Sequence, residues 1–172
     1  LSKALHSLYR TCVGMILWLA PIRPDIYYAV KELSRALSAP TEEDYAKPKH
    51  LGRYLRGTTT VFLLVSTQCT YSPEFIGRIA LYVDIDWAGC FKTRRSTSGF
   101  VIYLFGCATH FASRTQAVPA LSSAEAELYA MGTGSNEALH LRSFFLEAKI
   151  AKQVVITIHT DSSAGKSIAS RM

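Results

Sequence analysis

The chain has 172 residues, of which 49% are hydrophobic and 19% are charged. This composition excludes a largely disordered polypeptide, and the length is enough for one medium-sized domain, alone or with a helical extension. Lysine and arginine outnumber aspartate and glutamate by 19 to 13, so the formal net charge is +6, which suits a polyanionic partner such as nucleic acid.

The first part of the chain, residues 1–66, is predicted to form three helices. In the first helix, five apolar side chains recur at helical spacing and share one face: Leu5, Leu8, Cys12, Ile16 and Leu19. Pro21 ends this pattern, because proline disrupts the interior of a helix. The apolar run within it, residues 13–20, is far shorter than the roughly 20 residues that a membrane span needs. We therefore expect no membrane span.

Turn and capping residues mark the limits of the next two helices. The second begins at Pro24 and Asp25, and its apolar positions repeat at helical spacing: Ile26, Ala29, Val30, Leu33 and Leu37. The third begins after Thr41, whose hydroxyl can cap free backbone amides, and ends at Gly57. Pro48 lies inside this third helix and predicts either a kink or a later start.

The second part of the chain predicts an α/β domain with a mixed sheet and flanking helices. It follows a strand or extended segment over residues 58–65 and a linker over residues 67–77. Strands are expected over residues 79–84, 99–105, 109–113 and 154–160, and helices over residues 123–149 and 163–169. Gly132 and Gly134 weaken the middle of the longer helix. This order of elements predicts a mixed sheet with helical cover.

Three carboxylates lie at or beside these predicted elements. Asp84 ends the first strand of the sheet, Glu127 lies near the start of the long helix, and Asp161 follows the last strand. Three carboxylates that meet in a fold repel each other and resist burial unless a cation binds between them. Oxygen ligands of this kind suit Mg²⁺ or Mn²⁺. Two such ions, roughly 3.5 to 4 Å apart, can support phosphodiester hydrolysis.

Three motifs in this part of the chain resemble those of a known family. They read DIDWAGC from Asp84, RRSTSGF from Arg94 and ALSSAEAELYA from Ala120. Their order and spacing resemble the ribonuclease H region of copia-type retrotransposon polyproteins. Upstream, the segment RPDIYYAVKELSR and its surroundings over residues 9–57 resemble the connection between reverse transcriptase and ribonuclease H in the same polyproteins.

This resemblance implies a fold, a reaction and a set of site residues. It implies a ribonuclease H-like domain over residues 78–172, preceded by a reverse transcriptase connection segment over residues 1–66. The implied catalytic residues and metal ligands are Asp84, Glu127 and Asp161, with two Mg²⁺ or Mn²⁺ ions as cofactors. The implied reaction is hydrolysis of the RNA strand of an RNA·DNA hybrid, and the implied protein partner is the polymerase domain of the polyprotein.

Further acidic and basic residues beside the three carboxylates are candidates for supporting roles. Asp86 and Glu125 are candidates for contacts that support the metal ligands. Asp86 can instead be structural or contact the metal itself, and Glu125 can simply favour the helix dipole. Four cationic side chains are candidates for contacts with nucleic-acid phosphates: Lys92, Arg94, Arg95 and Arg114. The alternative for the loop that carries the first three is a solvated hairpin tip.

A second function remains open from the sequence. The family carries a fourth acidic residue, a last strand and a last helix beyond the third carboxylate, whereas this sequence stops at Met172, so a C-terminally truncated domain is expected. A catalytically inactive, domesticated or truncated copy would then act as a structural or interaction subunit beside other protein subunits. The four cysteines are widely spaced and are expected to be reduced, in an intracellular setting such as a cytoplasmic particle, the nucleus or an organelle.

Overall fold

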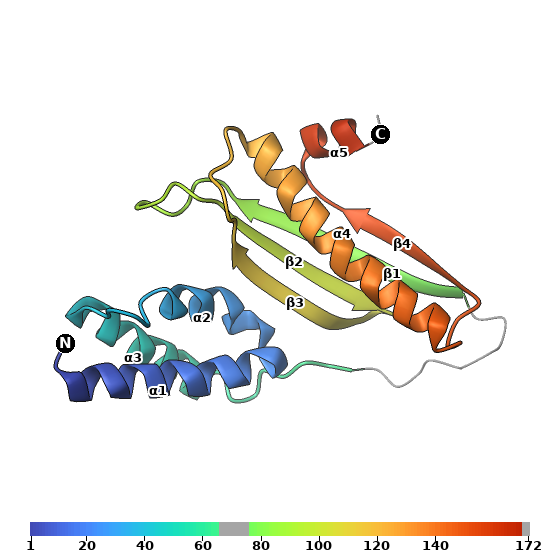
Figure 1. Cartoon of the computed structure of the whole chain (residues 1–172). Helices are drawn as coiled ribbons and strands as arrows, with labels where there is room; N and C mark the ends of the chain where they lie inside the picture. Colours follow the sequence, from blue (N-terminus) through green and yellow to red (C-terminus); the bar gives the residue numbers. More distant parts are fainter. Residues whose placement is uncertain (66–75, 170–172) are drawn as a thin grey trace. The chain divides into compact units, whose positions relative to one another are not determined.

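The computed structural model describes residues 1–65 and 76–169. The chain divides into two compact units, unit 1 over Leu1–Leu63 and unit 2 over Leu64–Met172 (Figure 1). Residues 67–75 of the predicted linker lie outside the described residues, and its last two residues already belong to the first strand. Within the described ranges, no helix combines the length and apolar character required to cross a membrane.

Unit 1 is built from helices around one apolar core. Its elements are α1 (Lys3–Leu19), the short 3₁₀ helices η1 (Ala20–Ile22) and η2 (Pro24–Ile26), α2 (Tyr27–Ser34) and α3 (Glu42–Gly57). The predicted apolar positions of the second helix do form the core, since Ile26, Val30 and Leu33 are all buried. The third helix begins at its predicted cap, because the Thr41 hydroxyl accepts the backbone N–H of Asp44. It runs through Pro48, so the alternative of a later start was wrong.

The first helix packs part of its predicted face, Ile16 and Leu19, against the core, but its most buried side chains lie on another stripe. Tyr9 and Val13 are 1% and 0% exposed, whereas Leu5 and Leu8 are 38% and 47% exposed. The Tyr9 hydroxyl donates a hydrogen bond to the backbone carbonyl of Leu33 at 2.7 Å and so holds this face against α2. Because α1 is apolar on more than one face, only the packing of its neighbours selects the face that is buried.

Unit 2 contains a mixed four-stranded sheet, as the sequence predicts. Its elements are β1 (Ile76–Asp86), β2 (Thr97–Leu104), β3 (Cys107–Thr115), α4 (Ser123–Glu147), β4 (Gln153–His159) and α5 (Ser163–Ala169). The strand order is β3-β2-β1-β4, with β1–β2 and β2–β3 antiparallel and β1–β4 parallel. The predicted fold class is therefore confirmed, and the arrangement is consistent with a ribonuclease H-like fold.

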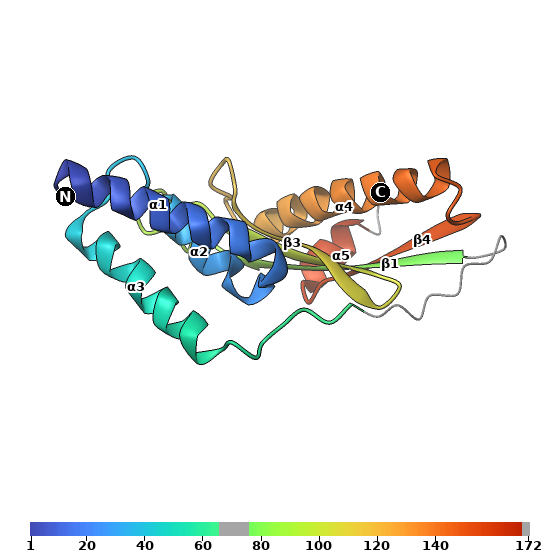
Figure 2. The ribbon, with the colours of Figure 1, turned by 90° about the horizontal axis from the view of Figure 1, so that it is seen from below.

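The long helix α4 covers one face of this sheet (Figures 1 and 2). The buried side of α4 includes the larger Met131 and four small residues: Ala126, Ala130, Gly134 and Ala138. They allow a close approach, because a Cβ added at Gly134 would stand 3.0 Å from Leu81 Cδ1. A Cβ added at Gly132 would meet no atom within 4 Å. The two glycines that weaken the predicted helix thus lie in different environments.

Candidate metal centre

The sheet register brings two of the three carboxylates to the same edge. In the parallel pair β1–β4, Tyr82 stands opposite His159. Asp84, near the end of β1, and Asp161, just beyond β4, each follow two residues later, so they lie at the same level on neighbouring strands. Because the carboxyl ends of parallel strands meet at one edge of a sheet, this position gives both side chains access to one point. Glu127 reaches that point from the second turn of α4.

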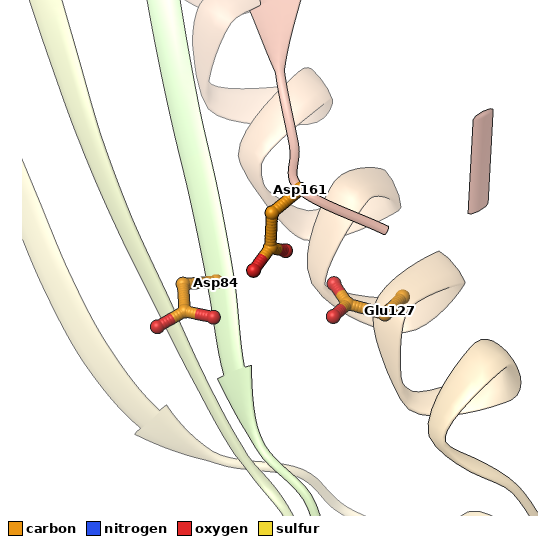
Figure 3. A group of neighbouring side chains, drawn as sticks. All are labelled: Asp84, Glu127 and Asp161. Carbon is orange, nitrogen blue, oxygen red and sulfur yellow. The ribbon is translucent and has the colours of Figure 1, made fainter. Parts of the chain in front are cut away.

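The three carboxylates converge in the structure (Figure 3). One oxygen from each of Asp84, Glu127 and Asp161 lies within 4.8 Å of the other two. Glu127 is only 8% exposed, whereas both aspartates are exposed. The site therefore has one buried wall and one side open to solvent.

The electrostatics of Glu127 fit a bound cation. Burial, and then the charges of Asp161 and Asp84, raise the pKa of Glu127 above its ordinary value. Its Oε2 atom is buried and has no hydrogen-bond partner among the described residues. A buried carboxylate oxygen without a donor is costly, and a divalent cation would satisfy it. The residues present thus fit a metal that prefers oxygen ligands.

Local capping contacts hold the ends of the elements that carry these ligands. Ser122 caps α4 by accepting the backbone N–H of Glu125 at 3.1 Å. Beyond β4, the Ser162 hydroxyl accepts the backbone N–H of Gly165 at 3.0 Å, as predicted for the cap of the last helix. Asp161 therefore lies in a short turn between a strand and a capped helix.

The two acidic candidates for supporting roles lie outside the converging group. Glu125 accepts the backbone N–H of Leu121 at 2.7 Å and the Tyr129 hydroxyl at 2.9 Å, so both of its oxygens are used in the first turns of α4. This contact pattern matches the interpretation of Glu125 as an acid that stabilises the helix start. Asp86 is the last residue of β1, and its carboxylate lies against Gly89 in the turn that follows. A Cβ added at Gly89 would stand only 1.9 Å from Asp86 Oδ2. Glycine at position 89 is required by that close approach.

The four candidate phosphate-binding residues fall into two groups. Lys92, Arg94 and Arg95 are exposed in the connection between β1 and β2, which begins directly after the strand of Asp84. Arg114 lies on β3 instead, where its Nη1 atom contacts Glu137 Oε1 on α4 at 3.1 Å. The structure thus keeps three of the four together, and Arg114 makes an ion pair between sheet and helix.

A further polar residue near the site carried no signal in the sequence. Gln116 follows β3, is 8% exposed and donates hydrogen bonds to Ser98 and to the backbone carbonyl of Ala126, the residue before Glu127. A single glutamine in a connecting segment matches no motif. Only the tertiary structure shows that it contacts the ligand-bearing helix.

Comparison with known proteins identifies relatives among transposon polyproteins. Over 142 residues, the chain is 35% identical to the retrovirus-related Pol polyprotein from transposon RE1 of Arabidopsis thaliana. This match covers 83% of the chain and 9% of that polyprotein. It is 32% identical over 157 residues to the retrovirus-related Pol polyprotein from transposon TNT 1-94 of Nicotiana tabacum. This match covers 91% of the chain and 11% of that polyprotein. The chain thus spans about a tenth of the length of these polyproteins.

A shorter relative is matched over nearly its whole length. The chain is 36% identical over 134 residues to secreted RxLR effector protein 161 of Plasmopara viticola. This match covers 77% of the chain and 90% of that protein. No family model and no solved structure matches the chain. The matches to Pol polyproteins from transposons support the prediction that the chain is a segment of a retrotransposon polyprotein. The chain belongs to the same family as secreted RxLR effector protein 161, and it is similar to one segment of the retrovirus-related Pol polyproteins of transposons.

Proposed function

We propose that unit 2 is a ribonuclease H-type domain of a copia-type retrotransposon polyprotein and that it hydrolyses the RNA strand of RNA·DNA hybrids. The observation that carries this proposal is the convergence of Asp84, Glu127 and Asp161 within 4.8 Å at the edge of a mixed sheet. The buried, unpartnered Oε2 atom of Glu127 supports a cation at this point. Similarity to a segment of retrovirus-related Pol polyproteins supports a nucleic acid as substrate.

The three carboxylates would together hold two Mg²⁺ or Mn²⁺ ions. Glu127, buried and carried by a helix, presents a ligand oxygen from the closed side of the site. Asp84 and Asp161 present theirs from the open side, where the scissile phosphate would enter. When bound, such ions supply Lewis-acid activation of water and stabilise the charge that develops at phosphorus.

Substrate recognition would come from backbone contacts. Lys92, Arg94 and Arg95 lie on one exposed connection next to the strand of Asp84 and are placed to contact phosphates. Selection of a hybrid over a DNA duplex would rest on groove shape and on 2′-hydroxyl contacts. Unit 1 would be the connection to the polymerase domain of the polyprotein.

The direct test is cleavage of a labelled RNA·DNA hybrid by the full chain, with Mg²⁺ or Mn²⁺ and with a chelator. We expect metal-dependent cleavage of the RNA strand. Asp161→Asn and Glu127→Gln should each reduce the cleavage rate by at least about 10- to 100-fold, which is the usual effect of losing a residue that only supports a metal ligand. Glu147→Gln is the matched control, because Glu147 lies exposed at the other end of α4. Equal cleavage by wild type and Asp161→Asn would exclude the proposed site. A wild-type chain that neither cleaves nor binds Mn²⁺ would favour the structural-subunit alternative.

A further inference from the structure

A buried set of polar contacts joins the strands of unit 2 to the start of α4. The Gln116 side-chain Nε2 donates to Ser98 Oγ and to the carbonyl oxygen of Ala126, both at 2.9 Å. The Gln116 backbone N–H donates to the carbonyl of Ser96 at 2.8 Å. Ser96 is 0% exposed, and its hydroxyl accepts the backbone N–H of Ala88 at 3.0 Å, in the turn that follows Asp84 and β1. A continuous chain of contacts thus runs from that turn to the residue before Glu127.

From these contacts we propose that Gln116 is a positioning residue for the metal centre: its amide holds the first turn of α4 at the height where Glu127 meets the two aspartates. This inference rests on the proposed metal centre and goes beyond it, because Gln116 is not itself a ligand. The contact with Ala126 acts on the backbone directly before the ligand residue. A small shift of that backbone moves the Glu127 carboxylate with it.

The apolar contacts at the start of α4 do not set its direction in the way that a hydrogen bond does. The helix begins with the small buried residues Ala126 and Ala130, which are 0% and 1% exposed, whereas its larger core side chains, such as Leu141 and Phe145, come later along the helix. Apolar packing is non-directional. A hydrogen bond is directional and loses strength quickly when its geometry changes. The Gln116 amide therefore supplies a restraint that the apolar contacts lack.

The orientation of the Gln116 amide follows from its neighbours. The carbonyl oxygen of Ala126 can only accept, so it must face the amide nitrogen and not the amide oxygen. In this orientation the Oε1 atom is buried without a hydrogen-bond partner among the described residues. An unsatisfied buried acceptor is unfavourable. The structure thus retains the donor contact with α4 at the expense of the acceptor.

The test uses Gln116→Met, which keeps the length of the side chain and removes its donor. Mn²⁺ titration of the full chain, followed by calorimetry and by the electron paramagnetic resonance signal of free Mn²⁺, measures the centre without any need for cleavage. We expect Mn²⁺ affinity to fall about tenfold, the lower end of what loss of an outer contact to a metal ligand costs. The matched control is Ser98→Ala, which damages the same buried contacts but leaves the bond from Gln116 to Ala126.

The two variants separate positioning from general stability. Ser98→Ala should lower the melting temperature while Mn²⁺ affinity stays within about twofold of wild type, and Gln116→Met should lose affinity under conditions where it remains folded. Equal affinity in Gln116→Met and wild type would overturn the positioning role. Wild type that binds no Mn²⁺ would instead overturn the proposed metal centre. If Gln116→Met does not fold, hydrogen exchange in the wild-type chain decides: slow exchange of a Gln116 side-chain amide proton supports the proposal, and exchange at the solvent rate overturns it.

Discussion

At the scale of single residues, the fold places one carboxylate of the proposed metal centre, that of Glu127, in an unfavourable electrostatic environment. Burial and two neighbouring aspartates raise its pKa, and one of its oxygens lacks a hydrogen-bond donor. The same environment that makes an ionised Glu127 unfavourable without metal makes a divalent cation favourable. Stability and metal binding are therefore linked through this one carboxylate.

The linkage predicts how stability depends on pH when no metal is bound. The folded-state pKa of Glu127 lies above its unfolded value, so its favourable contribution is complete below the unfolded pKa, about 4.3, and is lost as pH rises through the folded pKa. Glu127→Gln should therefore melt higher than wild type at neutral pH and should lack this loss. Thermal melts across pH, with Glu147→Gln as control, measure the effect.

Metal should reverse the difference between these two chains. Millimolar Mn²⁺ should raise the melting temperature of wild type and leave that of Glu127→Gln unchanged, because only the folded wild-type chain holds the complete ligand set. If Glu127→Gln melts lower than wild type and wild type gains nothing from Mn²⁺, these carboxylates do not form a working metal site.

At the scale of secondary structure, the two glycines of α4 separate helix propensity from packing. Gly132 is exposed and an added Cβ would meet no atom within 4 Å, whereas a Cβ on Gly134 would lie 3.0 and 3.2 Å from the two terminal carbons of Leu81. Leu81 is 0% exposed, so it has little room to move. The close contact between helix and sheet depends on the absence of a side chain at position 134.

Alanine at each position should therefore change stability in opposite directions. Gly132→Ala should stabilise the chain by about 0.5 to 1 kcal/mol, because alanine is the better helix former. Gly134→Ala should destabilise it by about 1 kcal/mol or more, because overpacking outweighs the same gain. Chemical denaturation of the two variants and wild type provides the comparison. A stabilising Gly134→Ala would show that Leu81 repacks without cost.

The start of α3 predicts a pH effect of the opposite sign in unit 1. A hydrogen bond from Lys47, and then those from Thr41, lower the pKa of Asp44 to about 2. Its contribution is present above the unfolded pKa, about 3.9, and is lost as pH falls toward the folded value. Because Lys47 is half-exposed, the effect should not exceed about 1 kcal/mol. Hydrogen exchange of the α3 amides between pH 5 and pH 2, as approximate limits, should show this loss in wild type and not in Asp44→Asn.

At the scale of the whole molecule, each unit has a core of its own. The buried cluster of unit 1 includes Tyr9, Val13 and Val30, and that of unit 2 includes Leu81, Ile102 and Ala130. All three converging carboxylates belong to unit 2. The ligand geometry therefore depends on the sheet and on α4, both of which are stabilised within unit 2.

Separate cores predict that damage to unit 1 leaves the metal centre intact. Val13→Ala removes two buried carbons at a fully buried position and should destabilise unit 1 by about 2 kcal/mol. Mn²⁺ affinity should stay at the wild-type value, and faster hydrogen exchange should be confined to the amides of α1 to α3. A parallel loss of Mn²⁺ affinity would show instead that the two units are energetically coupled.

The sequence by itself determined the elements and the identity of the three carboxylates. Helical and alternating periodicity, together with caps such as Thr41 and Ser162, depend on neighbours a few residues away, so the chain encodes them locally. The order of strands and helices was enough for the fold class. The motifs around Asp84, Glu127 and Asp161 were enough to select them from the acidic residues of the chain.

Only the tertiary structure decided which surfaces meet. The sequence could not show that α1 buries Tyr9 in place of Leu5, because both stripes are apolar and the choice belongs to α2 and α3. Nor could it show that Gln116 contacts Ala126, or that Arg114 pairs with Glu137. These contacts join residues on different elements, and their energies depend on a register and a packing distance that exist only once the chain has folded.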